Sequence, residues 1–181
     1  MSKLSPSNNK NNIVLIGHMG SGKSTLGSYL AKKLNYKFID TDTEIINKVD
    51  MSIGDFFDKY GEKKFRDIEE NIIIGLIEQN CKYVIAFGGG AFQSAKVRNS
   101  VKKNAASVWL KCDLKTLALR CSKKRNRPLL QNKDVRVVLK ELNKLRADNF
   151  SRANYIFNVS KKTKSQLASE IINKLSIYEK N

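Results

Sequence analysis

The chain has 181 residues, of which 41% are hydrophobic, and it carries a formal net charge of +17 at pH 7. This length fits one domain with a buried core, and no run of about 18 apolar residues occurs, which excludes a membrane-spanning helix. The three cysteines are odd in number and lack CxxC spacing. We therefore expect reduced thiols in a cytoplasmic protein, not a disulfide framework or a metal site.

The positive charge comes from 34 lysines and arginines against 17 aspartates and glutamates. One interpretation is a surface that binds nucleic acid. The other is a solvated coat of lysines, which we favour because no basic motif interleaved with aromatic residues accompanies the charge. In either case the charge would attract anionic substrates such as ATP.

Apolar runs and helical periodicities alternate along the chain. Residues 1–11 are polar, lack the apolar core of a signal peptide and are expected to form a disordered tail before a single domain of residues 12–181. Strands are expected at residues 12–17, 36–40, 83–90, 106–111 and 155–160. Helices are expected at residues 24–34, 43–61 with a break near Asp50, 62–80, 113–124, 134–153 and 164–180. This alternation predicts an α/β fold of three layers, α/β/α, with a five-stranded parallel sheet.

The stretch GHMGSGKST, residues 17–25, matches the pattern G-x-x-x-x-G-K-[ST] between a buried strand and a helix. Glycines let successive backbone N–H groups converge on phosphate oxygens, and the helix N-terminus adds positive charge. Lys23 can reach the outer phosphates and Ser24 can bind Mg²⁺. His18, the only histidine, is interpreted as a spacer in the variable part of the loop. The nucleotide contacts expected here are Gly20, Ser21, Gly22, Lys23, Ser24 and Thr25.

The sequence DTD, residues 40–42, ends the second strand, where an open parallel sheet faces its ligand crevice. Two carboxylates in this spacing can divide the work: one helps to hold Mg²⁺, and the other accepts a hydrogen bond from an attacking hydroxyl. A plainer interpretation is that Asp42 caps the following helix.

Two further motifs are compatible with a small acidic substrate. In GEKKFRDIEE, the glutamates Glu62 and Glu69 or Glu70 lie one helical turn from Arg66 and could orient it to grip a carboxylate; an ordinary surface ion-pair ladder is the alternative. The three glycines at residues 88–90 end a strand, so bare backbone could approach a ligand closely there, or could simply form a flexible turn.

Taken together, these motifs resemble the shikimate kinases. The stretches GHMGSGKST, DTD, SIGDFF, GEKKFR, GGG and RPLL, with Arg146 near the end of the next helix, occur in that family's order and at compatible spacing over about residues 12–175. The resemblance implies a P-loop fold like that of nucleoside monophosphate kinases, with a mobile lid. It also implies transfer of the γ-phosphoryl group of ATP to the 3-hydroxyl of shikimate, with Mg²⁺, in the chorismate pathway.

The resemblance also implies a role for each matching residue. Asp42 would contact the reacting hydroxyl, and Asp40 would support Mg²⁺ beside Ser24. Arg66 and Arg146 would hold the shikimate carboxylate. The ring of shikimate would lie against Gly88, Gly89, Gly90, Phe57 and Phe65.

The basic segment 123–133 matches the family's lid. Arg127 would move onto the phosphates as this lid closes and would act with Lys23 and Asp42 in catalysis, while Arg120 would pack on adenine. Two departures from the family pattern stand out: Phe150 occupies a position that is commonly tyrosine, and residues 158–165 lack a proline often found after the last strand.

Three alternatives remain open at this point. An aminoshikimate kinase would keep the same carboxylate grip, and a gluconate kinase would share the phosphate loop without the other motifs. A nucleotide-dependent RNA-binding protein would explain the charge but would have no use for the paired arginines. We expect a monomer with small-molecule substrates, no specific nucleic-acid partner and no membrane association.

Overall fold

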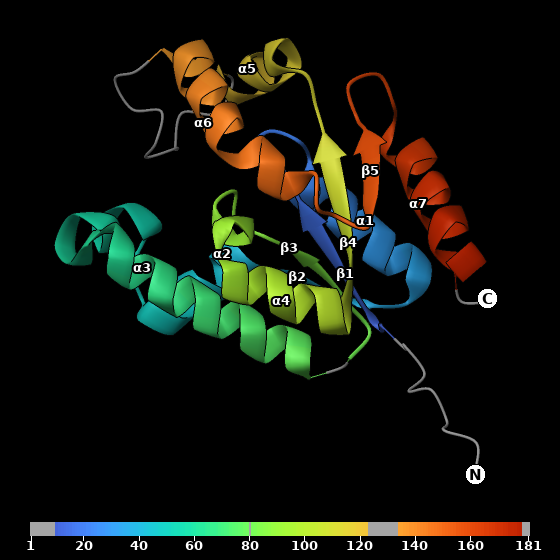
Figure 1. Cartoon of the computed structure of the whole chain (residues 1–181), viewed down its shortest axis with the longest axis horizontal. Helices are drawn as coiled ribbons and strands as arrows, with labels where there is room; N and C mark the ends of the chain where they lie inside the picture. The colour runs from blue at the N-terminus through green and yellow to red at the C-terminus, as the bar shows by residue number, and fades with distance from the viewer. Residues whose placement is uncertain (1–9, 80, 123–133, 179–181) are drawn as a thin grey trace.

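The computed structural model describes residues 10–79, 81–122 and 134–178, so the expected tail up to residue 9 and the lid 123–133 lie outside the described residues. Five parallel strands form one sheet in the order β2-β3-β1-β4-β5 (Figure 1). The strands are β1 (Asn12–Ile16), β2 (Lys37–Asp40), β3 (Tyr83–Ala86), β4 (Ala105–Lys111) and β5 (Tyr155–Asn158). The predicted fold class is confirmed.

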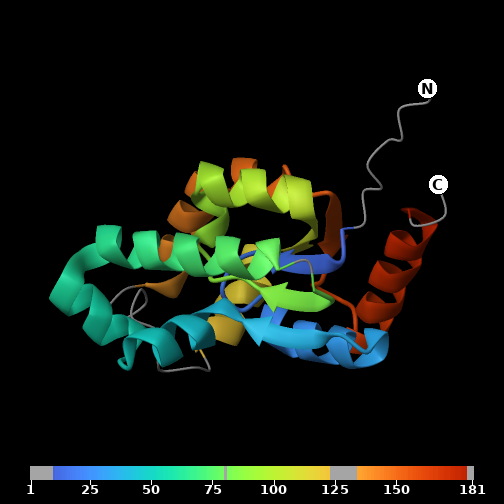
Figure 2. The same cartoon turned by 90° about the horizontal axis from the view of Figure 1, so that it is seen from below.

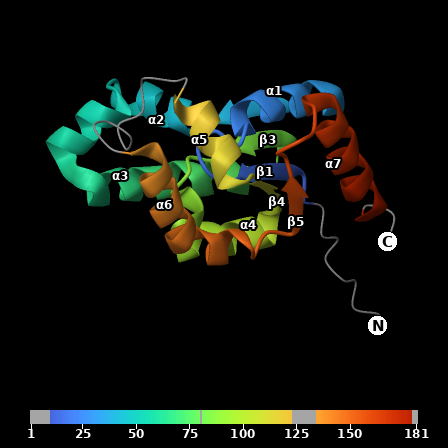
Figure 3. The ribbon, with the colours of Figure 1, turned by 90° about the horizontal axis from the view of Figure 1, so that it is seen from above.

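Helices cover both faces of the sheet (Figure 3). One face carries α1 (Lys23–Leu34) and α7 (Lys164–Tyr178), and the other carries α3 (Ile53–Glu78), α4 (Ala95–Asn104) and α6 (Val135–Phe150). The remaining elements are α2 (Thr41–Val49), α5 (Leu114–Ser122) and the short 3₁₀ helix η1 (Ala91–Gln93). Among the described residues, no helix combines the length and the apolar character that crossing a bilayer requires.

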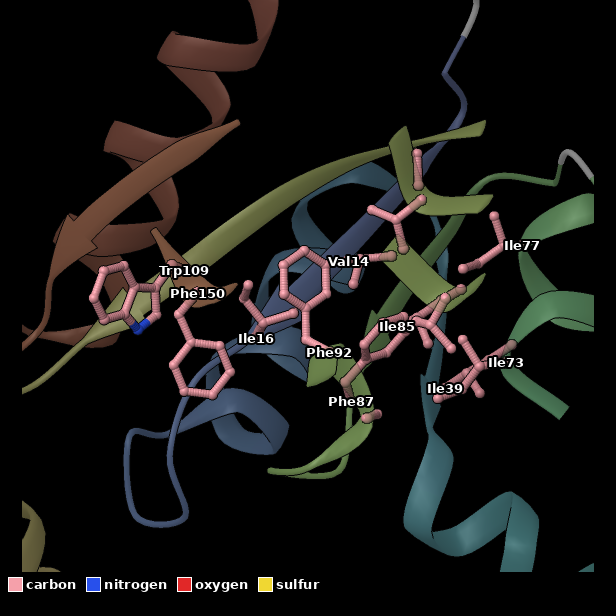
Figure 4. Packing of buried hydrophobic residues seen from close by; sticks show 14 residues of the cluster. Val14, Ile16, Ile39, Ile73, Ile77, Ile85, Phe87, Phe92, Trp109 and Phe150 are labelled. Carbon is pink, nitrogen blue, oxygen red and sulfur yellow. The ribbon is translucent and has the colours of Figure 1, made fainter. Parts of the chain in front are cut away.

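Strand β1 is buried along its whole length and divides the core in two. Ile13 and Leu15 pack with α1 and α7, whereas Val14 and Ile16 pack with α3, α4 and the aromatic residues near the end of α6. Side chains of a strand point alternately to the two faces, so a continuous apolar run is what a central strand between two helical layers requires. Figure 4 shows the second of these clusters, from Ile73 and Ile77 on α3 to Phe150 on α6.

The strand register brings three loops to one edge of the sheet. Leu15 of β1 and Asp40 of β2 both pair with Ala86 of β3, so these three strands end at nearly the same level. The phosphate loop after β1, the DTD segment and the glycines after β3 therefore begin side by side. This edge lies at the carboxyl ends of the strands, where open α/β sheets bind ligands.

One expected helix boundary is confirmed by the structure and another differs from the sequence-based expectation. The break near Asp50 is confirmed, since that residue ends α2 with a left-handed φ of 51°. The next two expected helices join into α3, which bends at Gly61, where φ is 79° and ψ is 166° (Figure 2). A backbone conformation of this kind is essentially restricted to glycine.

Candidate active site

The phosphate loop leaves β1 and leads into α1 through two glycines in left-handed conformations. Gly20 and Gly22 have φ angles of 79° and 96°, which glycine adopts without steric cost. Gly22 is the N-cap of α1 and has no side chain to bond the first N–H groups of the helix. Those N–H groups, together with the positive end of the helix dipole, form an anion-binding site.

Lys23 is the first residue of α1 and bends back over this loop. Its Nζ donates hydrogen bonds to the carbonyl oxygens of Gly17, at 2.9 Å, and His18, at 3.0 Å. The Ser21 hydroxyl is buried with no hydrogen-bond partner among the described residues, and Thr25 is exposed in the first turn of α1. The loop therefore gathers an ammonium group and several backbone N–H groups, a donor set that suits a polyphosphate.

A hydroxyl and a carboxylate meet beside the loop. Ser24 Oγ donates a hydrogen bond to Asp40 Oδ2 at 2.6 Å, and Asp40 Oδ1 accepts one from the backbone N–H of Asp42 at 3.1 Å. Asp40, and not Asp42, is thus the cap of α2. Within the described ranges, no three His, Cys, Asp or Glu residues group together as a metal site. The Ser24–Asp40 pair fits Mg²⁺, which is commonly held by one or two carboxylates together with substrate phosphates.

The glycines after β3 run against the DTD segment. Gly88 N–H donates to Thr41 Oγ1 at 2.9 Å. A Cβ atom on Gly88 would lie 2.6 Å from Asp42 Oδ1 and 2.7 Å from Glu69 Oε1. Both distances are shorter than van der Waals contact, so a side chain on Gly88 would displace one or both of these carboxylates.

Arg66 is held from two sides by glutamates of its own helix, α3. Its Nη1 donates to Glu69 Oε2 at 2.6 Å, and its Nη2 donates to Glu62 Oε1 at 3.0 Å. Burial lowers the pKa of Arg66, but attraction to these carboxylates outweighs burial and leaves the pKa raised. Arg66 therefore stays charged, and the two ion pairs fix the orientation of its guanidinium group. Glu70 belongs to a different network, with Ser94 and Lys96.

Arg146, on α6, is a buried cation. Only 7% of the residue is exposed, and within the described part of the chain it forms neither an ion pair nor a hydrogen bond. Burial, followed by repulsion from Arg66, lowers the pKa of its guanidinium group. A Cβ atom added to Gly89 would lie 3.1 Å from Arg146 Nη1 and 3.9 Å from Gly17 O. A buried guanidinium without a carboxylate partner is costly, so this position favours an anionic ligand.

A cavity of about 480 Å³ opens between α3, η1 and α6. Arg66, Gly90 and Arg146 line it, together with Glu62, Glu69 and apolar residues of α4 and α6. Asp42 and the phosphate loop do not line this cavity, but they meet it through the glycines, since Gly88 lies against Asp42 and Gly89 lies between Arg146 and Gly17. The three glycines thus place the phosphate loop and the Asp42 carboxylate next to the cavity that holds the two arginines.

Comparison with known proteins agrees with this geometry. A family model described as shikimate kinase matches residues 19–176. The chain belongs to the shikimate kinase family. Relatives named shikimate kinase include one from Bartonella henselae, 40% identical over 172 residues, which covers 93% of this chain and 81% of the relative. Another, from Brucella canis, is 37% identical over 166 residues and covers 92% of this chain and 82% of the relative.

Solved structures show the same family and fold. Shikimate kinase from Acinetobacter baumannii in complex with shikimate superposes with a TM-score of 0.86 at 32% identity, covering 92% of this chain and 93% of that one. A gluconokinase from Sinorhizobium meliloti has a TM-score of 0.61 at 19% identity, covering 95% of each chain. At that identity the second likeness shows only that the shikimate kinase family shares its fold with gluconokinases.

Of the other residues expected from the shikimate kinase pattern, the structure describes Phe57, Phe65 and Arg120 but not Arg127. The Phe57 and Phe65 rings pack together, with 4.6 Å between centroids, and lie 5.9 and 5.3 Å from the guanidinium carbon of Arg66. Phe65 is buried in the cluster behind Arg66, and Phe57 is half-buried. Arg120 Nη1 donates to Gly20 O at 3.2 Å, which places it beside the phosphate loop. Arg127 lies outside the described residues, and its role stays a prediction.

Sequence reasoning left three parts of this shikimate kinase site unassigned. The Thr41 hydroxyl anchors Gly88, and Glu69, which the sequence could not separate from Glu70, is the glutamate that binds Arg66. His18 Nε2 lies 3.1 Å from Asn143 Oδ1 on α6. Helical periodicity could have selected Glu69, because it lies on the buried face of α3 with Phe65 and Ile73. No local signal connects Thr41 to Gly88 or His18 to Asn143.

Proposed function

We propose that the protein transfers the γ-phosphoryl group of ATP to the 3-hydroxyl of shikimate, giving shikimate 3-phosphate and ADP. The observation that carries this assignment is the position of Arg146. Its buried guanidinium forms no ion pair or hydrogen bond among the described residues, and a Cβ atom on Gly89 would be close both to Arg146 and to Gly17 of the phosphate loop. A substrate that carries a carboxylate at one end and a reacting hydroxyl at the other fits between them.

The carboxylate end is held by two different arginines. Arg66 is fixed by Glu62 and Glu69 and offers a planar fork, and Arg146 supplies a second charge from the opposite wall of the cavity. Bidentate pairing with a carboxylate gives orientation as well as binding energy. The cyclic body of the acid would then rest on the backbone of residues 88–90 and against Phe57.

The reacting end lies at Asp42. As the substrate oxygen bonds to the γ-phosphorus, the bond between that phosphorus and the β–γ bridging oxygen breaks, and ADP leaves with the electron pair. We assign the hydroxyl proton to the Asp42 carboxylate, which acts as general base. Glu69 also approaches Gly88, and its carboxylate repels that of Asp42.

The nucleotide end lies at the phosphate loop. Lys23, the N–H groups of residues 20–25 and Arg120 would hold the phosphates, and Ser24 with Asp40 would hold Mg²⁺. When bound, Mg²⁺ offsets negative charge on the phosphates. Arg127, from the lid, is the further residue that the family resemblance assigns to this task.

An acceptor screen tests the proposal. Purified protein with ATP and Mg²⁺ is offered shikimate, aminoshikimate as its amino analogue, gluconate or no acceptor, and ADP release is followed by a coupled assay. We expect turnover with shikimate that exceeds the no-acceptor rate by several orders of magnitude, and no turnover by a Lys23→Ala variant. Gluconate also carries a carboxylate but no ring, so equal rates with gluconate would contradict recognition of a cyclic acceptor. Faster transfer to the amino analogue would reassign the acceptor. Salt-sensitive RNA binding without acceptor turnover would instead support a nucleotide-dependent RNA-binding protein.

A further inference from the structure

The single histidine of the chain lies at the junction of the two halves of the site. His18 is the second residue of the phosphate loop, and only 4% of it is exposed. Its Nε2 shares a hydrogen bond of 3.1 Å with Asn143 Oδ1, and its ring meets the Phe150 ring edge-on at 5.2 Å. Asn143 and Phe150 both belong to α6, the helix that carries Arg146.

The backbone of His18 is bound to the phosphate loop on its other side. Its carbonyl oxygen accepts hydrogen bonds from Lys23 Nζ at 3.0 Å and from Ser21 N–H at 3.2 Å. Asn143 precedes Arg146 by three residues, so the two side chains project from neighbouring turns of one helix face. Two short steps thus connect the phosphate-binding lysine to the buried arginine: Lys23 to His18, and His18 to the Asn143 turn.

We propose that His18 is a positioning residue that ties the phosphate loop to α6 and thereby sets the spacing between Lys23 and Arg146. This inference rests on the proposed function, because that spacing matters only where one ligand end is a phosphate and the other a carboxylate. His18 touches neither substrate, and its effect reaches the reaction through Asn143 and α6.

The environment of the ring suits this role. The pKa of His18 is lowered to about 4, mainly by burial and also by the positive charges of Arg146 and Lys23, while the hydrogen bond with Asn143 opposes the lowering. The ring is therefore neutral at physiological pH and adds no third cation between two others. Its Nδ1 is buried with no hydrogen-bond partner among the described residues, so Nε2 provides the polar connection to α6.

The test uses three variants of the full-length protein. His18→Phe keeps a ring against Phe150 but removes the hydrogen bond, Asn143→Leu removes its other partner, and His18→Gln keeps a polar group near the position of Nε2. A matched control is Asn149→Leu, which removes a side-chain hydrogen bond of 2.7 Å to Gln93 from the same helix. For each variant, kcat, the KM of each substrate, ADP affinity without acceptor and Tm are measured.

We expect kcat to fall about 10-fold or more in His18→Phe and in Asn143→Leu, since small misplacements of reacting groups cost up to about 100-fold. The double variant should lose no more kcat than the single variant with the larger loss, because both substitutions remove the same hydrogen bond. His18→Gln should recover kcat to within about threefold of the wild type, and the control should keep kcat despite a lower Tm. ADP affinity should change less than about twofold throughout.

Independent, multiplying losses in the double variant would overturn the link, as would kcat values near the wild type in both singles. If the control variant Asn149→Leu loses kcat in proportion to its loss of Tm, general destabilisation of α6 is enough to slow the reaction. His18 would then be only a structural residue. A wild-type protein that does not phosphorylate shikimate defeats the proposed function separately. In that event the same double-variant cycle, read from Tm, still decides whether the loop and α6 are coupled.

Discussion

Gly90 lies directly against the guanidinium group of Arg66. A Cβ atom on Gly90 would be 2.7 Å from Arg66 Nη2 and 2.8 Å from both Cζ and Nη1. The guanidinium group is restrained, because Glu62 and Glu69 accept hydrogen bonds from all three of its nitrogens. The third glycine after β3 therefore helps to set the position of Arg66, which we propose to bind the substrate carboxylate, although it contributes no side chain.

The first prediction follows from this contact. Gly90→Ala should raise the KM of shikimate by roughly 10- to 100-fold, since a displaced Arg66 loses charge-assisted hydrogen bonds of about 1.5–3 kcal/mol. Steady-state kinetics with each substrate varied in turn measure the effect, and the KM of ATP should stay within about twofold. The control is Gly75→Ala on α3, where a Cβ atom meets nothing within 4 Å. If both variants behave alike, Gly90 does not position Arg66.

Arg66→Lys is predicted to weaken shikimate binding more than it slows turnover. A lysine keeps the charge but replaces the planar fork with a point charge, so it cannot bond Glu62, Glu69 and a substrate carboxylate in the same geometry. We expect the KM of shikimate to rise roughly 10-fold or more, with the loss of a bidentate pair. Arg136→Lys, at an exposed position of α6, is the matched control. An unchanged KM would remove Arg66 from the carboxylate site.

Asp42→Asn tests the general base. The amide keeps the size of the side chain but cannot take the proton, so kcat should fall by roughly 10²–10⁴ while the KM of shikimate changes little. Single-turnover measurements separate the chemical step from product release. Asp50→Asn is the control at the other end of α2, where φ is 51° and asparagine is well tolerated. A change confined to KM would assign Asp42 to binding alone.

Ser24→Ala tests the metal site. Removing the hydroxyl that meets Asp40 at 2.6 Å should raise the Mg²⁺ concentration needed for half-maximal activity by roughly 10-fold, the loss expected for one ligand or strong hydrogen bond. Ser28→Ala, an exposed change on the same helix, should leave the Mg²⁺ dependence as it is. Identical Mg²⁺ titrations for wild type and Ser24→Ala would place the metal elsewhere.

The order of strands and helices could be predicted because apolar runs and turn residues alternate clearly. Helix α4 was missed for a physical reason. Between Ala95 and Asn104 only Val97 and Val101 are large apolar residues that become buried, too few to mark an apolar face. The helix is stabilised by Ser94, whose side chain caps it, and by the packing of those two valines against the sheet. Tertiary packing of this kind leaves little trace in a local pattern.

In the site, too, some residues are marked by a local sequence motif, whereas others are brought together only by the fold. Lys23 and Arg66 could be predicted because each belongs to a short motif whose chemistry depends on neighbours in sequence. Phe150, noted as a departure from the family's common tyrosine, lies between His18 and the Trp109 ring, whose nitrogen faces it in Figure 4. His18 was interpreted as a spacer because Asn143, its partner, is 125 residues away. Only the fold brings them together.

The buried His18 predicts a defined dependence of stability on pH. Its pKa is about 4 in the folded protein, against an ordinary value of 6.5 that applies when the chain unfolds. Between these values the unfolded state binds more protons, so the free energy of unfolding falls as the pH drops from about 6.5 to 4. The difference between the two pKa values corresponds to at most about 3.4 kcal/mol. Urea unfolding of the wild type and of His18→Gln, which does not titrate, isolates this contribution from that of the carboxylates. The difference in unfolding free energy between the two proteins should be constant above pH 7. As the pH falls to 4, the wild type should lose more stability than His18→Gln, because only the wild type has this ring to protonate. Parallel curves would mean that the ring is solvated in the native protein and does not link the loop to α6.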